Sequence, residues 1–201
     1  MDRKEIKFQP TLFSKEHKLI LDSEFIELYR YPEDREPTRF SKLEIDAFRF
    51  GVKWIRGYRT IFGRTNCIDV RSSTDEVISI RLTSIYKIRL RKINEKYKLI
   101  INIILNYYAS EIINHYLRLF EIRQPFSILD VRFNQPGIQL NDKIKIDWDD
   151  VDVKTYTRYV AISSRSKPDV YKGFQYLEEW NSIVLYNVIR MILKNKNLLS
   201  D

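Results

Sequence analysis

Two aspartates and a lysine in the second half of the chain have the residue types that metal-dependent nucleases use. Asp150 and Asp152 are followed by Lys154; in such enzymes carboxylates hold Mg²⁺, and a lysine steadies the attacking water or the transition state. The same acid-x-Lys spacing occurs at residues 2–4, 5–7 and 16–18. Because the spacing recurs by chance, a turn whose carboxylates accept hydrogen bonds from backbone amides is the simpler interpretation, and a metal-dependent hydrolase is kept as an alternative.

Few other residues could form a reactive centre. Cys67 is the single cysteine, so it can make no internal disulfide, and with His17 and His115 it cannot build a standard Cys/His zinc site. No Gly-rich phosphate loop, Ser-centred nucleophile elbow or His-Glu-x-x-His run occurs. We therefore expect Cys67 to be a small buried apolar residue, and we expect no enzyme activity, cofactor or metal.

A basic segment, residues 39–64, interleaves cations with aromatic side chains. Such a pattern can grip phosphates and stack bases; alternatively, the aromatic residues belong to the core and the cations are their solvated flanks. If the segment is a contact surface, its predicted binding residues are Arg49, Lys53, Trp54, Arg56, Tyr58, Arg59 and Arg64.

A second basic cluster comprises Lys87, Arg89, Arg91, Lys92, Lys96 and Lys98. It precedes and opens a predicted helix, where cations are electrostatically unfavourable, so an acidic partner is expected. The acidic patch that could supply it comprises Asp142, Asp147, Asp149, Asp150 and Asp152. Internal pairing, simple solvation and an ion held by the 142–152 patch all stay open.

Composition excludes several classes of protein. The 201 residues are 44% hydrophobic and 13% aromatic, which is enough apolar area for a core and excludes intrinsic disorder. Lys and Arg number 35 against 27 Asp and Glu, so the net charge of +8 favours anionic partners. The chain opens without a secretory signal, and polar residues interrupt the apolar stretch 99–117, which predicts a cytoplasmic protein without an integral membrane segment.

The periodicity of apolar residues predicts the main elements. Alternation in 67–71 and 77–82 predicts a hairpin with Ile68, Val70 and Ile78 on one side. Spacing of three and four predicts a helix over 93–120, with a bend near residues 109–110.

Later segments predict further strands and a closing helix. Pro136-Gly137 suits a type II turn with a positive φ at the glycine. Residues 144–148 and 151–162 alternate like strands, and Pro168 suits the first turn of a final helix. Strands followed by a helix, twice over, indicate an α+β fold: one domain over 1–201, with two possible lobes at about 18–122 and 125–196.

The stretch from Ile128 to Lys194 resembles the second half of bacterial pleckstrin-homology-like domains. The resemblance lies in the short strands, the Gln-Pro-Gly-Ile turn at 135–138, the run 144–151 and the amphipathic helix around 180–186. It implies a mainly antiparallel bent sheet closed by a C-terminal packing helix, with the helix at 93–120 inserted between the two halves of the sheet. It also implies a binding scaffold, commonly for proteins and sometimes for anionic headgroups.

We therefore expect a non-catalytic module that docks another protein, such as an adaptor or a toxin-neutralising immunity protein. The identity of that partner is left open. A binder of nucleic acid or of anionic lipid is the main alternative.

Overall fold

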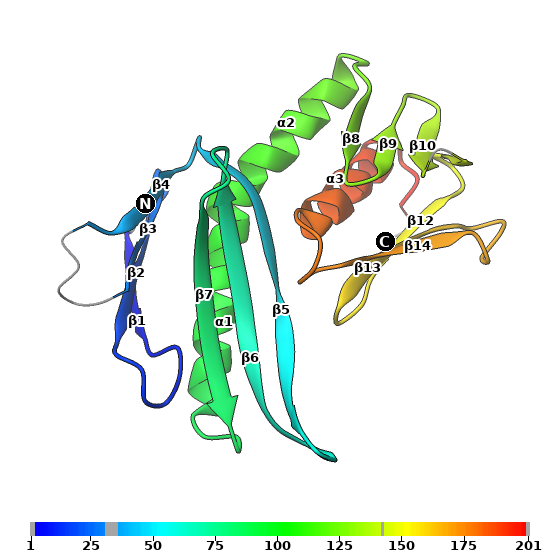
Figure 1. The fold of residues 1–201 in the computed structure, drawn as a ribbon. Coiled ribbons are helices and arrows are strands. Elements are labelled where there is room, and N and C mark those ends of the chain that lie inside the picture. The colour runs from blue at the N-terminus through cyan, green and yellow to red at the C-terminus, as the bar shows by residue number, and fades with distance from the viewer. Residues whose placement is uncertain (1–2, 31–35, 142, 200–201) are drawn as a thin grey trace. The chain divides into compact units, whose positions relative to one another are not determined.

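The computed structural model describes residues 3–30, 36–141 and 143–199, and the chain divides into two compact units. Unit 1 spans residues 1–110 and unit 2 spans residues 111–201. The sheets are antiparallel throughout and alternate with helices along the chain (Figure 1). The expected α+β class is confirmed.

Unit 1 begins with a four-stranded meander, whose strands pair in chain order. They are β1 (Lys4–Phe8), β2 (His17–Leu21), β3 (Phe25–Tyr29) and β4 (Thr38–Ser41). A three-stranded meander follows, formed by β5 (Ile45–Gly57), β6 (Thr60–Ser72) and β7 (Val77–Ile85). The hairpin expected between 67 and 82 is confirmed, because Ile68 lies opposite Ile80 and Val70 opposite Ile78, all four buried.

The long helix contains a π-helical turn near its middle. α1 (Leu90–Ile104) leads into η1 (Leu105–Ala109), and α2 (Ser110–Glu121) follows without a break. The helix therefore begins three residues earlier than predicted, and η1 ends at Ala109, next to the position at which the sequence predicts a bend. The Tyr108 hydroxyl in this turn lies 2.8 Å from the Asp22 carbonyl oxygen and 2.7 Å from that of Phe25, which ties the helix to the β2–β3 turn.

Unit 2 repeats the order of a four-stranded and a three-stranded meander followed by a helix. The first sheet consists of β8 (Phe126–Ile128), β9 (Val131–Phe133), β10 (Gly137–Leu140) and β11 (Ile144–Asp147). The second consists of β12 (Val151–Thr155), β13 (Tyr159–Ser164) and β14 (Tyr171–Gln175). Helix α3 (Ser182–Asn195) follows, and its residues Val184, Leu185 and Val188 are fully buried.

Expectations for three parts of the chain need correction: the long helix, the segment from 151 to 182, and Gly137. The long helix is not inserted within one sheet, because each meander before and after it pairs only with itself in the described residues. Residues 151–162 form two strands instead of one, and the segment after Pro168 enters strand β14, so the last helix begins only at Ser182. Pairing with β13 overrides the helix-start signal of the proline.

The third correction concerns Gly137, whose φ is not positive. Gly137 is the first residue of β10 and pairs with Asp147 of β11. A Cβ atom at this position would lie 2.1 Å from the carbonyl oxygen of Ile146. The glycine is therefore required by the close approach of the two strands and not by a left-handed turn.

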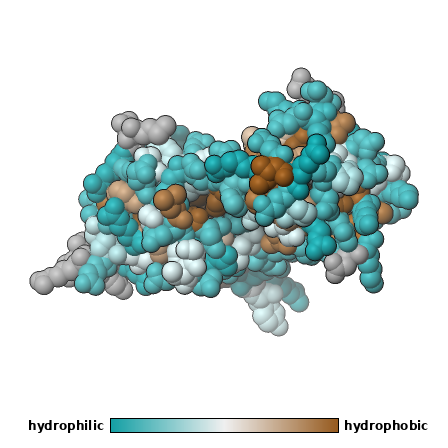
Figure 2. All heavy atoms as spheres, turned by 90° about the horizontal axis from the view of Figure 1, so that it is seen from above, coloured by the Kyte–Doolittle hydropathy of each residue, from teal (hydrophilic) through white to brown (hydrophobic). Residues whose placement is uncertain are grey.

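The described residues contain no helix that is both long and apolar enough to cross a bilayer. Hydrophilic side chains cover most of the face in Figure 2, and apolar side chains show there in small separate groups.

Candidate functional site

The β5–β6 hairpin carries all seven residues of the predicted binding surface, but it divides them between two faces. Trp54 lies opposite Arg64 in the pairing of the strands, whereas Arg49 and Lys53 point to the other face by strand alternation. Tyr58 and Arg59 form the exposed turn at the tip.

Arg49 has a structural role. Its Nε lies 3.1 Å from Asp69 Oδ2, and Arg81 Nη2 lies 2.6 Å from Asp69 Oδ1. Ser79 donates a further hydrogen bond of 2.8 Å to the same carboxylate. Because the Asp69 side chain is only 2% exposed, these partners compensate a buried charge.

Trp54 and Arg64 lie at a hollow of about 490 Å³, hereafter the Trp54 hollow. The Arg64 guanidinium lies 5.9 Å from the centre of the Trp54 ring and donates a hydrogen bond to Asn94 of α1. The remaining walls are mainly apolar, formed by Ile61, Phe62, Gly63, Tyr86 and Leu90, together with Ser84 and Lys87. Arg64 Nε is buried and has no hydrogen-bond acceptor among the described residues.

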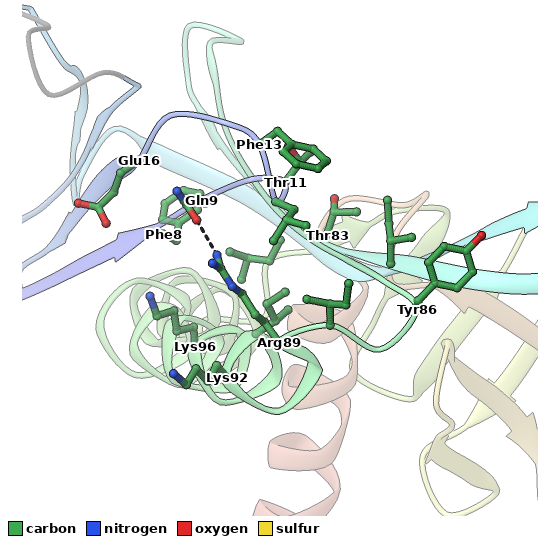
Figure 3. Close-up of a pocket in the computed structure, with 15 residues that line it drawn as sticks. Phe8, Gln9, Thr11, Phe13, Glu16, Thr83, Tyr86, Arg89, Lys92 and Lys96 are labelled. Carbon is green, nitrogen blue, oxygen red and sulfur yellow. Dashed lines mark hydrogen bonds between the residues drawn. The ribbon is translucent and has the colours of Figure 1, made fainter.

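A larger hollow of about 640 Å³ lies on the other side of Tyr86, and the sequence did not reveal it. Its walls come from the β1–β2 loop (residues 9–16) with the end of β1, the end of β7 and the first turns of α1, and we call it the β1–α1 groove (Figure 3). Its apolar residues are Phe8, Leu12, Phe13, Leu82, Ile85, Tyr86, Ile88 and Ile93. Phe13 and Tyr86 are 94% and 75% exposed.

The connection between β7 and α1 lines both hollows and has an unusual backbone. Tyr86, Lys87 and Arg89 have φ values of 50°, 62° and 56°, which cost L-residues about 1 kcal/mol or more each. Hydrogen bonds hold this conformation: Tyr86 N donates to Phe62 O at 2.7 Å, and Ser84 Oγ donates to Ile88 O at 2.9 Å. As a result Tyr86 contacts the Phe62 ring and lines both hollows.

Three cations of the second basic cluster line the β1–α1 groove, against the single carboxylate of Glu16. Arg89 reaches from α1 to the β1–β2 loop and donates a 2.7 Å hydrogen bond to Gln9 Oε1, as Figure 3 shows. Lys96 donates to the backbone carbonyl of Lys7. Within the ranges that the structure describes, neither of these side chains nor Lys92 has a carboxylate partner. The first turn of α1 also contains no acidic residue.

Two of the aspartates that could have compensated this cluster, Asp150 and Asp152, have local partners. Asp150 accepts hydrogen bonds from Ser164 Oγ at 2.5 Å and from Ser166 N at 2.7 Å. These bonds lower the pKa of Asp150 below its usual value, and the bond from Ser164 has the largest effect. Asp152 pairs with Lys154 at 2.7 Å, and Asp142 lies outside the described residues. Of the residues described, no three His, Cys, Asp or Glu side chains gather as metal ligands would.

The remaining candidates for chemistry are Cys67 and the two histidines. Cys67 lies in β6 and is completely buried, and this burial raises the pKa of its thiol. His17 packs edge-on against Phe8 in unit 1, and His115 packs against Tyr116 in unit 2. The described residues of unit 1 thus form two hollows, the Trp54 hollow and the β1–α1 groove. Comparison with protein-family models, with curated proteins and with solved structures finds no match to this chain.

Proposed function

We propose that the protein is a non-catalytic protein-binding module that docks its partner through the two hollows of unit 1. Adaptors and toxin-neutralising immunity proteins work in this way, since each needs a stable shape with a complementary surface. We propose further that the stretch from Ile128 to Lys194, which lies in unit 2, has a pleckstrin-homology-like design. Its short antiparallel strands and the helix α3 that follows them support this assignment.

The observation that carries the proposal is a continuous group of exposed apolar side chains. Phe13, Tyr86 and Ile88 are 94%, 75% and 47% exposed at the β1–α1 groove, and Trp54 is 39% exposed at the Trp54 hollow. Single exposed apolar residues are common, but a contiguous set beside a hollow is typical of an interaction site. Tyr86 lines both hollows and so joins them into one surface.

The test is affinity capture from a native lysate with immobilised protein and quantitative mass spectrometry. We expect the double variant Phe13→Ala with Tyr86→Ala to lose the partner that the wild type retains, and Trp54→Ala to weaken its recovery. Leu43→Ala is the matched control, because Leu43 is 92% exposed and lies in neither hollow. Unchanged recovery with the double variant would reject this surface.

A binder of anionic polymers or membranes is the second candidate. The observation in its favour is the end of the β5–β6 hairpin, where Arg56, Tyr58 and Arg59 are exposed. Trp54 and Lys53 are exposed next to them, on opposite faces of the hairpin. Such a binder predicts retention of nucleic acid or anionic vesicles that falls steeply with rising salt. Filter binding and vesicle sedimentation at low salt measure this directly.

A further inference from the structure

We infer that the partner presents an acidic amphipathic segment, with Leu, Ile, Phe or Trp side chains between Asp and Glu residues, and that this segment occupies the β1–α1 groove. The inference rests on the proposed protein-binding function and specifies the chemistry of the partner. Three observations carry it: the kind of apolar wall, the hydrogen-bond partners of the cations, and the shape of the site.

The apolar wall suits aliphatic and aromatic side chains. Leu12, Ile85 and Ile88 expose part of their surface at the groove, and Phe13 and Tyr86 lie at its margins (Figure 3). Nucleic-acid bases stack on aromatic rings and guanidinium planes, but aliphatic side chains offer them no such platform. A protein segment that inserts Leu, Ile or Phe side chains would remove this apolar surface from water.

The cations around the groove have neutral hydrogen-bond partners that a carboxylate can replace. Arg89 donates to the side-chain amide oxygen of Gln9, and Lys96 donates to a backbone carbonyl oxygen. A carboxylate is the better acceptor for either group, because it adds a charge–charge attraction that a neutral amide or carbonyl oxygen does not provide. Lys92 is exposed and can add a third contact. The partner segment is therefore acidic at the positions that face α1.

The shape of the site favours a chain segment over a membrane. The groove is a hollow of about 640 Å³, and clefts that enclose a ligand commonly measure about 300–1,000 Å³. A bilayer surface cannot fill such a concavity, whereas side chains on one face of a peptide can. Shape, apolar lining and charge thus agree on one class of occupant.

The test is selection of a random-peptide phage library on the immobilised full-length protein. We expect the enriched peptides to combine Asp or Glu with Leu, Ile, Phe or Trp at regular spacing. For a fluorescein-labelled enriched peptide, we expect the double variant Lys92→Glu with Lys96→Glu to raise Kd about tenfold or more. We expect Phe13→Ala to raise it as well. Rising salt should weaken the peptide complex only in part, since its apolar contacts are not screened.

Two controls separate a lost contact from a lost fold. Lys98→Glu makes one charge reversal of the same kind on α1, and Lys98 is exposed but does not line the groove. Leu43→Ala removes an exposed side chain away from both hollows. We expect both controls to bind the labelled peptide like the wild type, and all variants to keep the wild-type melting temperature.

Different results overturn the inference and the proposed function. Enriched peptides that are basic or uncharged, or that bind the double Glu variant unchanged, overturn the acidic segment but leave a protein-binding surface in place. A library without enriched clones overturns the inference too. If the protein then retains oligo(dT) or sediments with phosphatidylserine vesicles, and capture is insensitive to Phe13 and Tyr86, the proposed function fails as well.

Discussion

The carboxylate of Asp69 binds side chains from both neighbouring strands of the β5–β7 sheet. Its carboxylate is 2% exposed and receives Arg49, Arg81 and Ser79. The two arginines therefore act as counter-ions for a buried charge. For Arg49 this differs from the sequence-based prediction, which placed it in a contact surface. The exposed cations of the β5–β6 hairpin lie farther along, at Lys53, Arg56 and Arg59.

Replacing this carboxylate should lower the stability of the protein. We expect Asp69→Asn to lower the free energy of unfolding by about 3 kcal/mol, because two half-buried guanidinium groups lose their counter-ion. Asp75→Asn is the control: Asp75 is 87% exposed in its ion pair with Arg71, and we expect a change within about 0.5 kcal/mol. Urea denaturation followed by circular dichroism measures both. Equal effects of the two substitutions would contradict this role of Asp69.

Asp150 should make stability depend on pH. The hydrogen bonds from Ser164 and Ser166 lower its pKa in the folded protein, whereas the unfolded carboxyl titrates near about pH 3.9. The contribution of Asp150 is therefore complete above that pH and is lost as pH falls through the lower folded value. We expect Asp150→Asn to lose less stability than the wild type as pH falls from about pH 5 to about pH 2. Asp149→Asn, an exposed neighbour, controls for net charge.

At the scale of single elements, the β10–β11 pair depends on one glycine. A Cβ at Gly137 would meet the Ile146 carbonyl oxygen at 2.1 Å and Asp147 Cα at 2.8 Å, both atoms of the backbone. The strands cannot relieve this overlap by rotating a side chain, so they would have to separate at the start of β10.

We expect Gly137→Ala to destabilise the protein by about 2 kcal/mol or more. Gly173→Ala in β14 is the matched control, because its nearest contact would be the Tyr159 ring at 3.4 Å, an ordinary van der Waals distance. The control should stay within about 0.5 kcal/mol of the wild type. Thermal unfolding of the two variants compares them, and a larger loss for Gly173→Ala would refute the explanation.

At the scale of the whole molecule, the two units have separate sheets. Every strand of the first two sheets belongs to unit 1, and every strand of the last two belongs to unit 2. Each unit also has its own buried residues, such as Ile68 and Ile80 in unit 1 and Val160 and Phe174 in unit 2. Hydrogen-bonded elements of this kind commonly open as separate cooperative units.

Hydrogen exchange followed by mass spectrometry can detect this separation. We expect Asp69→Asn to accelerate exchange in peptides from β1 to β7 and to leave those from β8 to β14 unchanged. Gly137→Ala should do the reverse, because each substitution weakens a sheet that lies within one unit. Wild-type protein under the same conditions provides the reference. Acceleration across both units by either variant would show that they unfold together.

The sequence alone determined the elements whose signals are local. Alternation over 67–82 predicted the β6–β7 hairpin, since neighbouring positions on one strand face opposite sides. Spacing of three and four predicted most of the long helix. The same local signals were wrong at Pro168 and Gly137, where pairing with β13 and close approach to β11 decide the structure.

Only the tertiary structure decided the candidate site. The β1–α1 groove joins residues 8–16, 82–86 and 88–96, and no spacing along the chain records that these segments meet. Its geometry also depends on positive φ values at Tyr86, Lys87 and Arg89. A glycine in the sequence would have indicated such a turn, but these residue types do not. Tertiary contacts likewise separated Arg49, which neutralises Asp69, from Trp54 and Arg64, which line a hollow. Charge and aromaticity are properties of residues, but a surface exists only once distant segments are packed together.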